Sequence, residues 1–282
     1  MKSQSASLIL RRNLCYIVLV ILAFLSLFPF FILIINSTRS HSQIQLGFSL
    51  LPGTSFFKNL KDLLTNPNMP VLRALFNSVY VSIMSAILTT YFSCMTAYGI
   101  YMYRFKGRKF SFRFILLVMM VPAQISTAGF IKLITKIGMI DTLPALYIPA
   151  IAAPIVFFYL YQAMESTLPY SIVEAARVDG CNEFRTFNEV AIPMMKPSIA
   201  VQAIFSFVSS WNNYFTPALV ISNKNKKTVP IMIAQLRSAD YQKFNMGTVY
   251  MQIFLSIVPL MIVYLFLSRS IIAGVTAGGV KE

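Results

Sequence analysis

Charged side chains are scarce in this sequence. Only 12% of its 282 residues are Asp, Glu, Lys or Arg, and 57% are hydrophobic, whereas a soluble domain carries roughly 25% charged residues. A chain with so few charged residues cannot keep the whole surface of a 282-residue protein in contact with water. We therefore expect the lipid bilayer to be its solvent. Acids are scarcest, with 9 against 24 basic residues. The basic residues lie in short loops between apolar runs, which suits anionic lipid headgroups and not nucleic acid.

Residues that carry common chemistry are also missing. His41 is the only histidine, and the sequence contains neither a P-loop for ATP nor a His/Cys/Glu cluster at metal-ligand spacing. Of the three cysteines, Cys15 and Cys94 lie in apolar runs, so with Cys181 they indicate no disulfide framework. We therefore expect no catalytic residue, metal or cofactor in this chain. If it transports a solute, the energy comes from another polypeptide.

Six long stretches of the chain contain no Asp, Glu, Lys or Arg. Each approaches or exceeds the roughly 20 apolar residues that a spanning helix needs, although the third is short. No ionisable residue lies well inside them, which argues against a proton- or ion-coupled carrier. The sequence predicts an all-α integral membrane protein, one domain over 1–282, with six transmembrane helices. The predicted spans are about 14–36, 74–103, 113–132, 142–164, 197–222 and 245–268.

The distribution of cations sets the expected orientation. Short cytoplasmic loops are rich in Lys and Arg, and the turn 104–113 carries five of them. The N-terminal Lys2, Arg11 and Arg12 agree with this assignment. We therefore expect a multi-pass protein of the cell membrane with both termini, the loop 165–196 and the tail 269–282 in the cytoplasm.

The loop 165–196 is a polar insertion between the fourth and fifth spans. Ser171 and Glu174 fit a capping box, and Gly180 suits a helix end in the left-handed conformation. These signals predict a short helix over Ser171–Asp179, and a second one from Asn182 to a point before Pro193. Such a charged helix outside the bilayer is well shaped to dock on a cytoplasmic partner.

The same loop resembles the EAA motif of ATP-binding-cassette (ABC) importer permeases. Glu174-Ala175-Ala176, then Gly180, then Val190-Ala191-Ile192-Pro193 follow the spacing E-A-A-x3-G-x9-I-x-L-P, with Val for Ile and Ile for Leu. In that family the motif helix, called the coupling helix, seats in a cleft of the ATPase subunit. By resemblance, the docking residues are Glu174, Ala175, Ala176, Arg177, Asp179 and Gly180. Glu174 would pair with a basic group of the ATPase.

Two further segments are similar to the carbohydrate branch of these permeases. Phe76-Asn77-Ser78 resembles an N-S element at the start of the second span, and Ala273–Lys281 resembles the tail of the maltose/oligosaccharide class. The resemblance implies a second permease subunit, two ATPase subunits that bind ATP and Mg, and an extracellular or periplasmic solute-binding protein. It implies a carbohydrate or oligosaccharide as the transported solute and no enzyme activity in this chain.

Two predicted spans carry polar residues at helical spacing. In the second span, Ser78, Ser82, Ser85, Thr89, Ser93 and Thr96 share one face, which favours helix packing. In the fifth, the stripe fits either packing or a water-lined pathway, and Trp211-Asn212-Asn213-Tyr214 fits either sugar contact or an interfacial anchor. The candidate pathway residues are Gln202, Ser206, Ser209, Trp211, Asn212, Asn213 and Tyr214.

Alternatives to a sugar-importing permease stay open at this point. A self-sufficient facilitator acting as a homo-oligomer would transport without ATP. An ABC importer permease for a non-sugar solute would share every feature of the coupling loop. A membrane-embedded enzyme would need a polar catalytic cluster at depth, and the sequence contains none.

Overall fold

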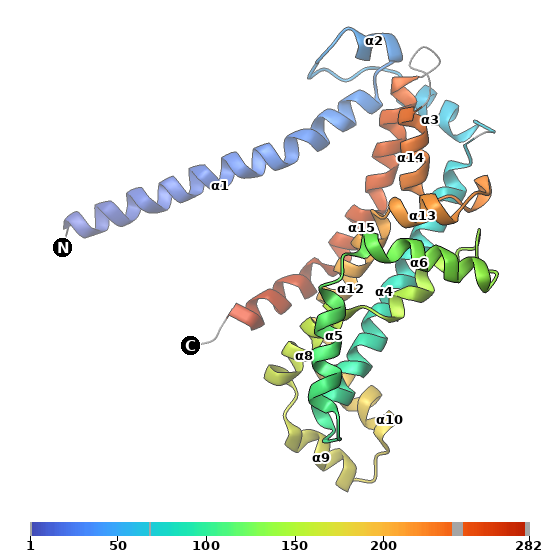
Figure 1. Cartoon of the computed structure of the whole chain (residues 1–282). Coiled ribbons are helices and arrows are strands. Elements are labelled where there is room, and N and C mark those ends of the chain that lie inside the picture. The colour runs from blue at the N-terminus through green and yellow to red at the C-terminus, as the bar shows by residue number, and fades with distance from the viewer. Residues whose placement is uncertain (1, 68, 239–244, 280–282) are drawn as a thin grey trace. The chain divides into compact units, whose positions relative to one another are not determined.

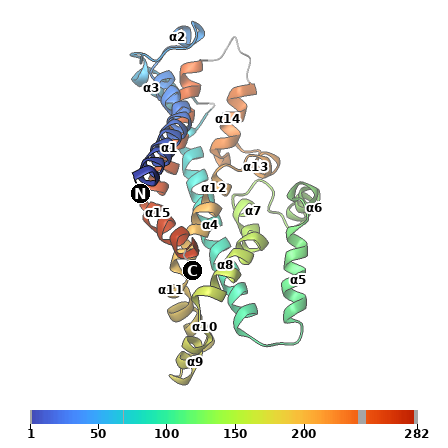
Figure 2. The same ribbon diagram turned by 90° about the vertical axis from the view of Figure 1, so that its left-hand side faces the viewer.

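The computed structural model describes residues 2–67, 69–238 and 245–279 (Figures 1 and 2). Helices are the only regular secondary structure among these residues, which confirms the all-α class. The chain forms two compact units. One is built from Met1–Pro67 and Leu236–Ile257, and the other from Asn68–Gln235 and Val258–Glu282.

Four helical segments of the described residues are long and apolar enough to cross a membrane. They are Arg11–Ser37, Val71–Met102, Pro144–Thr167 and Met246–Leu265. A fifth candidate is the pair Glu183–Met194 and Lys196–Trp211, which is bent by 83°. The four segments coincide with the first, second, fourth and sixth predicted spans. A count of six spans therefore stays a prediction.

The third predicted span is not one helix. Instead of a continuous helix over 113–132, the structure has α5 (Arg108–Met119) and α6 (Ala123–Lys136), with the break at Pro122. Proline cannot donate a backbone hydrogen bond, and it disfavours the helical conformation of the residue before it. The predicted third span thus contains a helix break at Pro122, and a membrane crossing by α5 and α6 together stays a prediction.

The first unit contains α1 (Lys2–Ser37), α2 (His41–Gln45), α3 (Phe56–Leu64) and the first part of α15 (Met246–Gly279). The buried Asn59 amide on α3 donates to the carbonyls of Ser37 and Arg39, both at 2.9 Å. These bonds satisfy acceptors at the end of α1 that the helix leaves free. The region 39–73 thus holds two helices and the start of a third.

Gly247 lies where the start of α15 approaches Asn59. A Cβ atom at Gly247 would lie 2.6 Å from Asn59 Oδ1 and 2.8 Å from the carbonyl oxygen of Arg39. We expect Gly247→Ala to lower the melting temperature in detergent, because overpacking costs about 1–3 kcal/mol. The matched control is Gly99→Ala on α4, where a Cβ meets nothing within 4 Å. Equal melting temperatures for the two variants would contradict the prediction.

The second unit is organised around α4 (Val71–Met102), which packs against α8 (Pro154–Thr167) and α12 (Lys196–Trp211). Short helices α7 (Pro144–Tyr147) and η1 (Ile148–Ile151) precede α8. At the far end of the unit are α13 (Phe215–Val220), η3 (Lys224–Lys226) and the start of α14 (Val229–Ser238). In both views α9 (Tyr170–Val178) and α10 (Glu183–Thr186) lie at the lower end of this unit (Figures 1 and 2).

Candidate docking helix and polar faces

α9 occupies the place where the sequence predicts a short helix, but its first turn differs from the prediction. Pro169 takes the N-cap position with an extended backbone (φ −64°, ψ 140°), and no side chain caps the helix. The helix therefore begins at Tyr170, one residue early. Ser171 then lies inside the first turn, so the predicted capping box between Ser171 and Glu174 is wrong.

The C-terminal end of α9 is closed by Gly180. Its φ of +82° is left-handed, which glycine adopts without steric cost. The N–H of Cys181 then donates to the carbonyl of Ala176 at 3.0 Å, and the N–H of Gly180 donates to Arg177 at 3.1 Å. This pair of bonds is the Schellman motif, which satisfies carbonyls at a helix end. The glycine signal in the sequence thus predicts this end of the helix correctly.

Burial divides α9 into two faces. Val173 and Ala176 are buried against the rest of the unit, whereas Glu174, Ala175 and Asp179 are exposed. Ala176 was expected to offer its small side chain to a partner, and its burial corrects that expectation. It leaves Ala175 as the small exposed residue next to Glu174, whose carboxylate makes no salt bridge within the described chain.

Two apolar side chains near the motif are strongly exposed. Val178 is 87% exposed and Phe184 on α10 is 69% exposed. Neither position belongs to the EAA pattern, so the sequence reasoning missed both. Their signal was an apolar residue inside a polar insertion, which the spacing of the motif alone does not flag.

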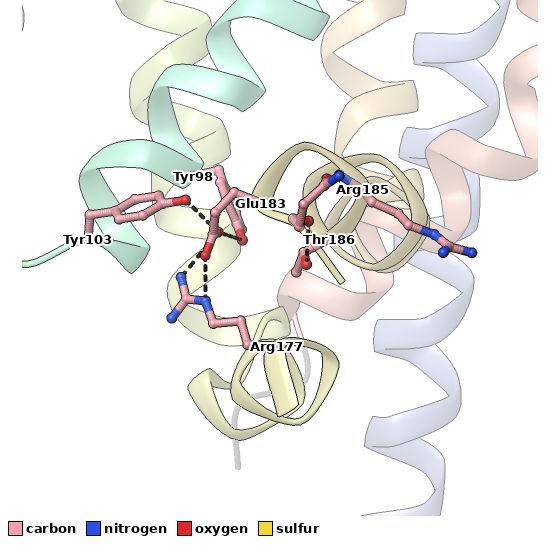
Figure 3. A network of polar contacts seen from close by, with 7 residues as sticks. Tyr98, Tyr103, Arg177, Glu183, Arg185 and Thr186 are labelled. Atoms are coloured by element: carbon pink, nitrogen blue, oxygen red, sulfur yellow. Dashed lines mark hydrogen bonds and ion pairs between the residues drawn. The ribbon is translucent and has the colours of Figure 1, made fainter. Parts of the chain in front are cut away.

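Glu183 joins the loop after α9 to the end of α4, as Figure 3 shows. Its carboxylate accepts hydrogen bonds from the Arg177 guanidinium at 2.8 and 3.3 Å and from the Tyr98 hydroxyl at 3.4 Å. The Tyr103 hydroxyl also donates to it, and the Arg177 guanidinium lies over the Tyr103 ring. We call Tyr98, Tyr103, Arg177 and Glu183 the clasp.

The clasp favours the ionised form of Glu183. Burial alone would raise its pKa, but the hydrogen bonds from Arg177, Tyr103 and Tyr98 outweigh burial and lower the pKa below its ordinary value. The same contact raises the pKa of Arg177. A carboxylate with a lowered pKa stabilises the fold above its unfolded pKa, and this contribution is lost as the pH falls. The ion pair of the clasp is therefore complete at neutral pH.

The other end of α9 is also tied to α4. The Tyr170 hydroxyl donates to the backbone carbonyl of Tyr101 at 2.8 Å, and the two rings lie 4.8 Å apart. With the clasp at the C-terminal end, both ends of this nine-residue helix contact the last turns of α4. α9 cannot shift along α4 without breaking one of these contacts.

The second helix predicted for the loop starts at Asn182 as expected, but the helical segment continues past Pro193. Asn182 caps α10, and its side chain accepts from the N–H of Arg185 at 2.8 Å. The chain then passes through a π-helical segment, η2 (Phe187–Ala191), into α11 (Ile192–Met194), which contains Pro193. The prediction that this second helix ends before Pro193 is therefore wrong. The N–H of Ile192 donates to the carbonyl of Phe187, five residues earlier, so a π turn directly precedes the proline.

The polar stripe of the second span is a packing surface. Its first five members are buried and only Thr96 is exposed. Thr89 donates to the carbonyl of Ala150 at 2.9 Å, and Ser210 on α12 donates to Ser85 at 3.2 Å. Small residues with hydroxyls let neighbouring helices approach and bond across the contact. The packing interpretation of this stripe is confirmed.

The candidate pathway residues of the fifth span do not share one environment. Trp211 is 3% exposed, stacks on Phe207 with ring centroids 5.9 Å apart and packs with Ala86. Trp211 therefore has no exposed ring face in the described chain, and the choice between sugar contact and an interfacial anchor for this segment stays open. Ser206 Oγ is buried without a hydrogen-bond partner in the described chain, and Gln202 is half-buried.

The remaining candidates are exposed. Ser209 lies on the outer face of α12, and Asn212, Asn213 and Tyr214 form the break between α12 and α13. The Asn213 side chain accepts from the N–H of Thr216 at 3.3 Å, which stabilises the start of α13. The amides of Asn212 and Asn213 thus lie together in an exposed helix break, whereas the neighbouring Trp211 is buried.

Comparison with known proteins identifies the family. The family model described as "Binding-protein-dependent transport system inner membrane component" matches residues 89–276. The arabinooligosaccharides transport system permease protein AraQ of Halalkalibacterium halodurans is 35% identical over 267 residues, which cover 92% of this chain and 93% of the relative. This chain belongs to that family of inner-membrane transport components.

Two further comparisons agree with the family. The lactose transport system permease protein LacG of Rhizobium radiobacter is 32% identical, with 94% of this permease and 95% of the relative covered. The crystal structure of a bacterial ABC transporter involved in the import of the acidic polysaccharide alginate contains a chain that matches with a TM-score of 0.80. That match is 21% identical and covers 91% of this permease and 95% of that chain. At that identity it shows the fold alone. The permease is a membrane-embedded transport subunit, as the sequence predicts.

The N-S element of this permease fastens its second span to a distant loop. The Asn77 amide donates to the carbonyls of Asn225 and Lys227, both at 3.0 Å. The Ser78 hydroxyl accepts from the N–H of Val229 at 2.8 Å. The element therefore holds residues 225–229 against the start of α4. The predicted family tail over 273–281 includes residues 280 and 281, which lie outside the described residues.

Asp141 holds the same loop from another side. Its carboxylate accepts from the N–H groups of Ser222 and Asn223, both at 2.9 Å, and pairs with Lys226 at 3.5 Å. The bond from Asn223 is the main reason that the pKa of Asp141 lies below its ordinary 3.8. A lowered carboxylate pKa stabilises the fold above the unfolded value, so this contribution is fully present at neutral pH and fades below about pH 4.

We expect Asp141→Ala to open the loop 222–229 of the permease. Hydrogen bonds to a charged group contribute about 1.5 kcal/mol or more, so trypsin should cleave after Lys224 and Lys227 roughly tenfold faster. Mass spectrometry of the digest measures the rate. The control is Asp62→Ala on α3, which removes the same charge without touching this loop. Unchanged cleavage in Asp141→Ala would contradict the prediction.

Proposed function

We propose that this chain is one permease subunit of an ABC importer and forms half of the translocation pathway for a carbohydrate or oligosaccharide. The observation that carries the proposal is α9, a short helix with an exposed acidic face, fastened at both ends to the inner end of a long apolar helix. Neither feature is needed by a facilitator that works without a partner. The relatives named for arabino-oligosaccharides and lactose support the sugar class.

The proposal assigns the energy source to other chains. ATP and Mg bind to two ATPase subunits, a second permease subunit completes the pathway, and a solute-binding protein outside the membrane delivers the sugar. The family description names binding-protein dependence, which supports the last of these partners. Both termini, the turn 104–113 and α9 face the cytoplasm in this arrangement.

α9 is the proposed docking helix. The exposed carboxylate of Glu174 pairs with a cation of the ATPase, and Ala175 permits close approach because it adds little bulk. Asp179 and Gly180 close the same end of the surface, and Val178 adds apolar area. Arg177 takes a different role, since its guanidinium is engaged in the clasp. Ala176 supports the helix from inside.

The proposed pathway lies along the break after α12. Asn212, Asn213 and Tyr214 carry the amides and the aromatic ring that match sugar hydroxyls, and they are exposed on this chain. Gln202 and Ser209 extend the polar surface along α12. In this arrangement the second permease subunit covers the exposed side chains and supplies the other wall.

Uptake by the reconstituted importer tests the proposal. The chain is purified with its copurifying subunits, placed in liposomes with ATP inside, and supplied with the solute-binding protein and a labelled arabino-oligosaccharide or lactose. We expect uptake that requires ATP. Uptake by this chain alone without ATP would establish the facilitator instead. ATP-dependent uptake of a non-sugar solute, with no sugar uptake, would overturn the substrate class only.

A further inference from the structure

The turn between α4 and α5 carries a dense group of cations that the described chain does not neutralise. Five Lys or Arg residues lie within 104–113. None of them forms a salt bridge with a described acid, since the three ion pairs of the structure involve Arg177, Arg185 and Lys226. Like charges at this density repel one another. An anion bound at the turn would remove that repulsion. The cations are Arg104, Lys106, Arg108, Lys109 and Arg113.

The cations border an open hollow. Its volume is about 340 Å³, and it is lined by Arg104, Phe105, Gly107, Arg108, Lys109 and Phe110. Small-molecule sites in proteins begin at roughly 300 Å³, so a headgroup-sized ligand fits. Gly107 has a left-handed φ of +97° and turns the chain sharply there, which places cations from both sides of the turn around one space.

Arg108 lines this hollow and is half-buried. Burial alone would lower the pKa of its guanidinium, but interactions with the hydroxyls of Tyr161 on α8 and Tyr170 on α9 outweigh burial and raise it. Tyr170 is the first residue of α9, so the turn lies next to the docking helix.

Aromatic side chains flank the cations on the outside. Phe105 is 45% exposed, Phe110 is 73% exposed and Phe114 is 55% exposed. The rings of Phe110 and Phe114 stack with centroids 6.1 Å apart, whereas Phe112 points inward and packs on Tyr161 at 4.7 Å. The turn follows the last residue of the apolar helix α4, so this aromatic face lies at the edge of the bilayer.

We propose that residues 104–110 bind the phosphate of an anionic phospholipid, with the aromatic face against its acyl chains. Cations recognise the phosphate, exposed rings contact hydrocarbon, and the position beside a spanning helix brings both within reach of one molecule. A soluble phosphate compound would use the cations but leave the rings in water, which is why a lipid fits better. The site requires neither the ATPase nor a sugar.

Lipid binding to the purified full-length chain tests this site. The chain in mild detergent is titrated with phosphatidylglycerol or phosphatidylcholine, and bound lipid is counted by native mass spectrometry. We expect phosphatidylglycerol to bind roughly tenfold more tightly than phosphatidylcholine, and Arg104→Gln/Lys106→Gln/Lys109→Gln to remove that preference. The control Lys58→Gln/Lys61→Gln/Lys224→Gln removes three exposed cations elsewhere and should keep it. Far-UV circular dichroism checks that both variants remain folded.

Three outcomes would overturn the proposal. The first is equal binding of the two lipids to the unmodified chain, and the second is an equal loss of preference in both triple variants. The third is full displacement of phosphatidylglycerol by excess inorganic phosphate, which would show a free-anion site. The lipid site would be supported if phosphatidylglycerol stays bound in excess phosphate and binds more weakly to the Phe105→Ser/Phe110→Ser variant. Each result stands whether or not α9 docks on an ATPase.

Discussion

Replacing Gly180 with valine is expected to lower ATP-driven uptake at least about tenfold. An L-residue in the left-handed conformation costs roughly 1–2 kcal/mol, and a β-branched one costs more. Valine would therefore leave this conformation and break the bonds from the N–H groups of Gly180 and Cys181. The end of α9 would then unwind and displace Asp179 from the docking surface. Uptake in proteoliposomes and retention of the ATPase during purification measure the effect.

The chain supplies a matched control for this change. Gly138 also has a left-handed φ, of +73°, and closes α6 by the same motif, with the N–H of Met139 donating to the carbonyl of Ile134 at 2.8 Å. Gly138→Val costs similar strain away from α9 and should leave the ATPase bound. Gly180→Asn should retain most uptake, because asparagine tolerates the left-handed conformation. Equal losses of ATPase in the two valine variants would indicate general strain and contradict docking at α9.

Replacing Glu183 with alanine is expected to separate ATP hydrolysis from transport. The carboxylate accepts from Arg177, Tyr98 and Tyr103 at once, so its removal releases the C-terminal end of α9 from α4 and leaves only the Tyr170 contact at the other end. Glu174 stays exposed and the ATPase still binds. Movement of α9 would then reach α4 through the Tyr170 contact alone, and uptake should fall by about tenfold or more per ATP hydrolysed. Parallel assays of phosphate release and sugar uptake give this ratio.

Glu189→Ala is the control for loss of a carboxylate in the same segment. Glu189 pairs only with Arg185, four residues earlier, and both side chains are more than half exposed. Exposed pairs of this kind contribute little to stability, so the ratio of uptake to hydrolysis should not change. Glu183→Gln should recover part of the coupling, because its amide oxygen still accepts from the tyrosines. A Glu183→Ala transporter with an unchanged ratio would refute the role of the clasp.

The apolar windows and the helix signals of the loop were readable because their causes are local. A long run without charge is stable only away from water, and four such windows contain helices long enough to span. Gly180 closes α9 because no other residue adopts its backbone conformation as readily. Asn182 begins the next helix because its side chain reaches an N–H three residues later. None of these statements depends on a distant part of the chain.

Local signals failed where two of them competed. Pro169 starts α9 before Ser171 can cap it. Pro193 was expected to end a helix, but the chain passes through it, in a π-helical segment followed by α11. In each case a proline determined the outcome, and its effect depended on the backbone geometry of its neighbours.

The sequence by itself determined that the chain is helical and membrane-embedded, that a short helix lies between two spans, and that its motif resembles that of ABC importer permeases. Only the tertiary structure decided which face of that helix is free. Ala176 and Trp211 are buried because side chains far away in sequence cover them, and Glu183 is fastened by tyrosines some 80 residues earlier. Composition and spacing report the preferences of each segment. The partner that each side chain meets is set by packing between segments that the chain brings together only when it folds.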